Sequence, residues 1–85
     1  MTDAEIKRFI RDRDKTFTAA VMEDDWDGFK EYTQRWGIDL PSNERVMKSG
    51  VYKAVQEIKS IPKAVKNVAR EKCIAMGFKP TIWEG

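Results

Sequence analysis

The sequence predicts an all-α fold, a small compact bundle of four helices followed by a short extended C-terminal tail. Two observations support this prediction. Apolar residues recur at three- and four-residue intervals in four separate segments, which is the spacing of amphipathic helices. Capping residues, glycines and prolines separate these segments by short loops. We expect a single domain with helices at 3–23, 25–36, 43–59 and 62–76 and a tail at 78–85. A three-helix core with one shorter helix laid across it is the nearest alternative.

The first helix begins with a capping-box pattern, in which Thr2 caps the helix and Glu5 reaches back. One face carries an apolar stripe, and Arg13 interrupts that stripe. We expect the Arg13 stem to cover apolar surface while its guanidinium reaches water or a carboxylate; a buried anchor is the alternative. The stripe consists of Ile6, Phe9, Ile10, Phe17, Ala20 and Val21.

The second helix is unusually aromatic. Asp24 or Asp25 can cap its start, and Gly37 can end it by adopting a left-handed backbone. Its apolar side chains share an arc of about 120°, so we expect them to lie in the core of the domain. In the rival interpretation Trp26 or Tyr32, at the edges of the arc, stays exposed and stacks on a ligand. The arc contains Trp26, Phe29, Tyr32, Thr33 and Trp36.

The third helix follows Pro41, and Ser42 or Asn43 can cap it. Gly50 lies inside this helix, where glycine costs roughly 1 kcal/mol relative to alanine. We expect another helix to cross closely at Gly50; a bend in the helix is the alternative. The apolar stripe consists of Met47, Val51, Ala54, Val55 and Ile58, with Val46 beside it.

The fourth helix ends at Gly77, and Phe78 is expected to fold back towards Cys73. We expect Ile82 and Trp83 to pack against the bundle, or else to form a free apolar hook that binds a partner. The apolar stripe of this helix consists of Ile61, Val65, Val68, Ala69 and Met76.

The composition argues against catalysis. The chain has no histidine, which is the commonest general base and metal ligand, and Cys73 is its single cysteine. Cys73 lies late in its helix, where the dipole does not favour a thiolate, so we interpret it as a small packed residue. The acids at 23–25 suit helix capping and solvation better than metal binding. We therefore expect no enzymatic activity, no metal, no cofactor and no small-molecule substrate.

Charge is divided unequally along the chain. Residues 1–42 carry seven Lys or Arg against ten Asp or Glu, while residues 43–85 carry nine against four. Four bases spaced four, three and four residues apart would form a ridge about 60° wide if the fourth helix extends back to residue 59. Such a ridge can neutralise phosphates, but it can equally be a solvated face. The candidate polyanion-binding residues are Lys59, Lys63, Lys66 and Arg70.

The order of three segments, IKRFIRDRDKTFTAAVMEDDWDGFKEYTQRWGI, VYKAVQEI and KCIAMGF, resembles short uncharacterised all-α proteins of bacterial prophages and mobile elements. The shared positions are core residues and helix stops. The resemblance therefore implies a bacterial, phage-derived setting and carries no functional residue over to this chain.

Together these features predict a non-catalytic module for protein–protein interaction or assembly, with a protein partner or self-association. The alternative is a nucleic-acid-binding module that uses the basic ridge, although the sequence pI of about 8.8 lies below that of most such modules. The start of the chain lacks the pattern of a signal peptide, and no apolar run reaches about 18 residues. We therefore expect a cytoplasmic protein without a membrane partner.

Overall fold

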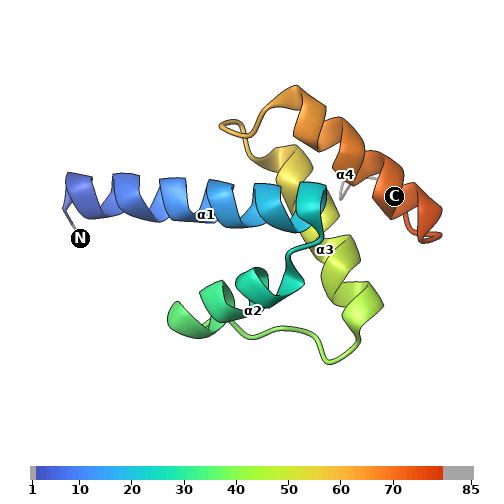
Figure 1. The fold of residues 1–85 in the computed structure, drawn as a ribbon, viewed down its shortest axis with the longest axis horizontal. Coiled ribbons are helices and arrows are strands. Elements are labelled where there is room, and N and C mark those ends of the chain that lie inside the picture. The colour runs from blue at the N-terminus through green and yellow to red at the C-terminus, as the bar shows by residue number, and fades with distance from the viewer. Residues whose placement is uncertain (1, 80–85) are drawn as a thin grey trace.

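The computed structural model describes residues 2–79, and this part of the chain contains four α-helices and no strand (Figure 1). The all-α prediction is confirmed, and the predicted ends of the helices move by at most two residues. Ile82 and Trp83, predicted to pack or to bind a partner, lie outside the described residues. The helices are α1 (Asp3–Glu23), α2 (Trp26–Arg35), α3 (Glu44–Glu57) and α4 (Lys63–Ala75).

The helices form two hairpins, α1 with α2 and α3 with α4 (Figure 1). Within residues 2–79, α1 is the helix whose backbone approaches all three others. The core accordingly surrounds the C-terminal half of α1, where Ala20 and Val21 are fully buried. The other buried apolar residues are Trp26, Phe29, Tyr32, Met47, Val51, Tyr52, Val55, Ile61, Val65, Ala69 and Cys73.

Side-chain caps fix three helix starts. Thr2 Oγ1 accepts from the Glu5 amide at 3.2 Å and Asp25 Oδ1 accepts from the Gly28 amide at 3.1 Å, while Asn43 Oδ1 accepts from the Val46 amide at 3.2 Å. For α2 the cap is therefore Asp25 rather than the alternative Asp24, and for α3 it is Asn43 rather than Ser42.

The helix ends also follow the sequence. Gly37 and Gly77 both have positive φ, 66° and 86°. Asp24 ends α1 instead of capping α2, with φ of 54°, in the left-handed region. Phe78 folds back as predicted, since its amide donates to the Cys73 carbonyl at 3.2 Å and its ring packs against the core.

Polar contacts connect the elements. The Lys72 ammonium on α4 contacts both the Val21 carbonyl and, at 3.2 Å, the Asp24 carboxylate at the end of α1. In the turn before α4, the Ser60 hydroxyl donates to Asp14 of α1. Arg13 pairs with Asp14 at 3.1 Å and is half-buried, so the predicted pairing of its guanidinium with a carboxylate is confirmed.

The expectation of a close helix crossing at Gly50 is wrong. A Cβ placed on Gly50 meets no described atom within 4 Å, and the residue is exposed. Gly50 instead borders an apolar groove, so no steric demand of a neighbouring helix accounts for a glycine there.

Candidate interaction surfaces

The aromatic residues of α2, namely Trp26, Phe29 and Tyr32, all belong to the core. Trp26 is 8% exposed and Tyr32 is 2% exposed, so the rival prediction that one of them stays open to a ligand is wrong. The Trp26 ring packs edge-on against Phe29, with centroids 5.7 Å apart, and against Tyr52 on α3 at 5.8 Å. The Trp26–Tyr52 contact joins α2 to α3.

Trp36 was predicted to lie in the core and does not. It is 39% exposed, because it is the residue that follows the last helical position of α2, at the end of the hairpin far from α3 and α4 (Figure 1). Its ring packs edge-on against Phe9 of α1, with centroids 4.9 Å apart and planes at 89°. Trp36 therefore extends the surface of α1 rather than the core.

The apolar stripe of α1 is likewise only partly covered. The N-terminal half of α1 projects beyond the other helices in Figure 1, and Ile6 and Ile10 are 41% and 38% exposed. This end of the stripe is therefore exposed, although the same stripe is buried at Ala20 and Val21. We call the surface formed by Ile6, Phe9, Ile10 and Trp36 the open face.

A length mismatch explains the open face. Helix α1 has 21 residues, about 32 Å, whereas α2 has 10 and α4 has 13. The shorter helices cannot cover a stripe that runs the length of α1. This mismatch was already present in the predicted helix lengths and is the sequence signal that could have revealed the open face.

Charged residues border the open face on both edges. On one edge Arg35 of α2 pairs with Asp12 of α1 at 3.0 Å. On the other edge helical spacing places Asp3, Lys7 and Arg11, and all three are exposed. An apolar strip between charged edges has the composition of a small protein–protein interface.

Other large apolar residues are exposed at separate places: Met22, Ile38, Val46 and Ile74. Exposed apolar side chains on separate elements are common in monomeric proteins and need no function.

The basic ridge is shorter than predicted. Helix α4 begins at Lys63, so Lys59 lies in the preceding turn and the condition that placed it on the ridge is not met. Lys63, Lys66 and Arg70 do share one face of α4, within about 60°. The first turn of α4 has no acid, and Pro62 gives no side-chain cap, so the positive end of the helix dipole lies beside Lys63.

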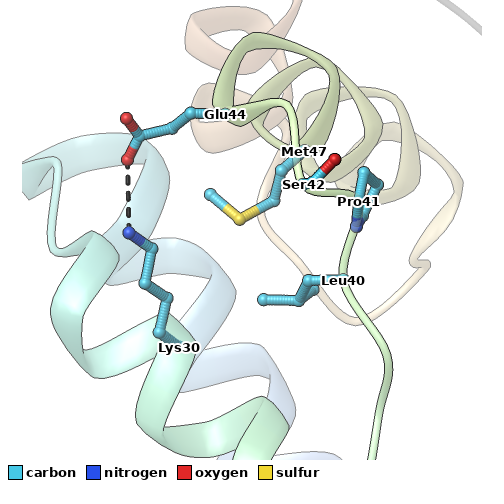
Figure 2. Close-up of a pocket in the computed structure, with 6 residues that line it drawn as sticks. All are labelled: Lys30, Leu40, Pro41, Ser42, Glu44 and Met47. Atoms are coloured by element: carbon cyan, nitrogen blue, oxygen red, sulfur yellow. Dashed lines mark hydrogen bonds and ion pairs between the residues drawn. The ribbon is translucent and has the colours of Figure 1, made fainter.

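Two pockets next to each other are small. One, of about 240 Å³, is shown in Figure 2, where Lys30 of α2 meets Glu44 of α3 beside the side chains of Leu40 and Met47. The ammonium and carboxylate are 3.2 Å apart and therefore satisfy each other. The second, an apolar groove of about 190 Å³, is lined by Phe17, Leu40, Pro41, Val46, Met47, Gly50, Val51 and Ala54. Both volumes are below the roughly 300–1,000 Å³ of typical ligand sites.

Cys73 is fully buried, as its interpretation as a packing residue requires. Burial raises the pKa of its thiol, while the Lys53 ammonium opposes this shift. The thiol donates to the Lys79 carbonyl at 3.1 Å. A neutral, enclosed sulfur is a poor nucleophile.

Residues 2–79 contain no group of three or more Cys, Asp or Glu side chains that could hold a metal ion. In the same range, no helix combines the length and the apolar character needed to cross a bilayer.

Comparison of the chain with protein-family models, curated proteins and solved structures finds no match. The function is therefore argued from the surfaces described above.

Proposed function

We propose that this protein is a non-catalytic module that binds another protein through the open face, and that it acts in the cytoplasm in a bacterial, phage-derived setting. One observation carries the proposal: the apolar stripe that is buried at Ala20 and Val21 continues, uncovered, through Ile10 and Ile6. Covering both isoleucines would remove apolar area from water, which favours association by about 25 cal/mol per Å².

The proposal is tested by recovering partners from the source organism with matched variants. Ile10→Glu places a charge in the open face, whereas Ile74→Glu makes the same change on α4 at a residue that is 50% exposed. We expect Ile10→Glu to abolish recovery of proteins that the wild type and Ile74→Glu both retain. Equal recovery by all three proteins would remove the open face as the binding site.

A second candidate function is binding of nucleic acid through α4. The observation that favours it is that Lys63, Lys66 and Arg70 share one face of α4, and that Lys63 lies at the positive end of the helix dipole. Binding of this kind weakens with salt, with a slope of about −0.9 in log K per phosphate contact on duplex DNA.

The test is a titration of duplex and single-stranded oligonucleotides at low and moderate salt. Replacing Lys63, Lys66 and Arg70 with alanine should remove binding. Replacing three bases on α1 with alanine should not, and the matched set is Arg8, Arg11 and Lys15. Absence of binding at low salt, or binding unaffected by the α4 changes, would end this candidate.

A further inference from the structure

We infer that the occupant of the open face is a second copy of this chain, with the two α1 helices packed antiparallel. The inference rests on the proposed function, because it names the partner of the same surface. It follows from two properties of the face, the repeat of its apolar residues and the arrangement of charge on its two edges.

The apolar residues of the open face are spaced so that they can pack against the same residues of a second, antiparallel copy. Ile6 and Ile10 are four residues apart on one face of α1, so a two-fold axis midway between them places Ile6 of each copy opposite Ile10 of the other. An interface with this symmetry uses the same patch on both chains and closes after two copies. Phe9 and Trp36 lie beside the isoleucines and would widen the contact.

The edge of the open face formed by Asp3, Lys7 and Arg11 carries opposite charges at its two ends. Asp3, Lys7 and Arg11 are exposed and lie within about 80° of each other around α1. In an antiparallel pair related by this axis, each edge meets the same edge of the second copy in reverse order. Asp3 of each chain therefore comes close to Arg11 of the other, while the two Lys7 residues lie near each other at the axis.

The opposite edge also carries opposite charges at its two ends, from Glu5 of α1 and Arg35 of α2. Glu5 is exposed near the start of α1, and Arg35 is held about two turns further along by its 3.0 Å pair with Asp12. The antiparallel arrangement brings Glu5 of each copy towards Arg35 of the other. In a parallel two-fold pair, the edge with Asp3 and Arg11 would instead meet the edge with Glu5 and Arg35, so that Asp3 of one copy would lie near Glu5 of the other, and like-charge repulsion disfavours this arrangement.

The contact is short. The open face spans roughly two helical turns, about 10 Å, so the area buried falls below the roughly 1,200 Å² of stable interfaces. We expect a reversible dimer with a dissociation constant on the order of 100 µM. Such a dimer is detectable at high protein concentration and is lost on dilution.

Sedimentation equilibrium from about 10 µM to 1 mM tests this directly. The wild type and Ile74→Glu should dimerise in this range, whereas Ile10→Glu should raise the dissociation constant at least about tenfold. In an NMR dilution series, the indole N–H resonance of Trp36 should shift with concentration while that of the buried Trp26 should not. A wild type that stays monomeric at about 1 mM overturns the inference.

Charge variants test the orientation at low salt. Arg11→Glu should weaken the dimer, because it opposes Asp3 of the second copy with a like charge. Lys63→Glu is the matched control, since it makes the same change in net charge at an exposed residue of α4, away from the open face. Equal effects of the two variants would overturn the antiparallel pairing, and so would an unchanged dimer with Arg11→Glu. This test needs no change to the apolar residues.

Failure of the inference and failure of the proposed function give different results. A monomeric wild type whose partners are still lost with Ile10→Glu would exclude the second copy and leave binding of another protein in place. A monomeric wild type whose partners do not depend on Ile10 would remove both.

Discussion

The rings of Phe9 and Trp36 meet edge to face 4.9 Å apart, and this contact holds the end of α2 against the projecting half of α1. The Arg35–Asp12 pair lies beside it on the same side of α1. Neither contact belongs to the buried core, so Trp36 packs against α1 at the surface of the protein.

Trp26, the first residue of α2, and Trp36, which follows its last residue, should therefore differ in their contribution to stability. We expect Trp36→Ala to lower the free energy of unfolding by about 1 kcal/mol, through loss of one aromatic pair and partly exposed area. Trp26→Ala should cost about 3 kcal/mol or more, because it leaves a cavity between α2 and α3. Urea unfolding followed by circular dichroism measures both. Equal losses would contradict the assignment of Trp36 to the surface.

Gly50→Ala should stabilise the protein by about 0.5–1 kcal/mol, because alanine loses less backbone entropy in a helix than glycine does. The added Cβ meets no described atom within 4 Å, so no clash offsets the gain. Thermal and urea unfolding give the measurement. A destabilised variant would mean that the groove beside Gly50 is filled in solution.

Gly28→Ala should not give this gain. A Cβ at position 28 would lie 2.6 Å from Asp25 Oδ2, in the carboxylate that caps α2. The cap must move, and losing it costs about 1 kcal/mol. In an Asp25→Ala background, the same Gly28→Ala change should become stabilising. A double-mutant cycle measures this coupling, and additive effects would show that the cap tolerates the methyl group.

Stability should fall at alkaline pH. Burial raises the pKa of the Cys73 thiol above 9.0 and those of the Tyr32 and Tyr52 hydroxyls above 10.0. For an acid whose pKa is higher in the folded state, the stabilisation is complete below the unfolded pKa and is lost as pH rises through the folded pKa. The free energy of unfolding should therefore decline above about pH 9.

The alkaline decline can be assigned by variation of Cys73. Cys73→Ala removes one of the three groups, so its decline should be shallower than that of the wild type. Urea unfolding from pH 7 to pH 11 gives the comparison. A decline of unchanged slope would show that the thiol does not take part.

Lys72→Met should destabilise the protein by about 1 kcal/mol, because it removes the charged donor to the Val21 carbonyl and to Asp24 while keeping most of the stem. Lys63→Met makes the same change at an exposed position on α4 and should stay within about 0.5 kcal/mol of the wild type. Unfolding at low and high salt measures both variants. If they behave alike, Lys72 does not fasten α4 to α1.

Local chemistry determined much of this structure from the sequence. Thr2, Asp25 and Asn43 can accept from amides three residues ahead, and Gly37 and Gly77 tolerate a left-handed backbone. These effects act within a few residues, so the helix boundaries and the all-α class could be predicted. The core role of Phe29 and Val55 followed from helical periodicity for the same reason.

The tertiary arrangement alone decided which part of each apolar stripe is covered. Helical periodicity placed Ile6, Ile10 and Trp36 on apolar stripes just as it placed Val21 and Tyr32, yet only the last two are buried. Periodicity reports the direction of a side chain around its own helix, whereas burial depends on whether another helix is long enough and close enough to cover it. That is also why Gly50 borders an open groove. Lys59 lies outside the α4 ridge for a local reason instead, because α4 begins only at Lys63.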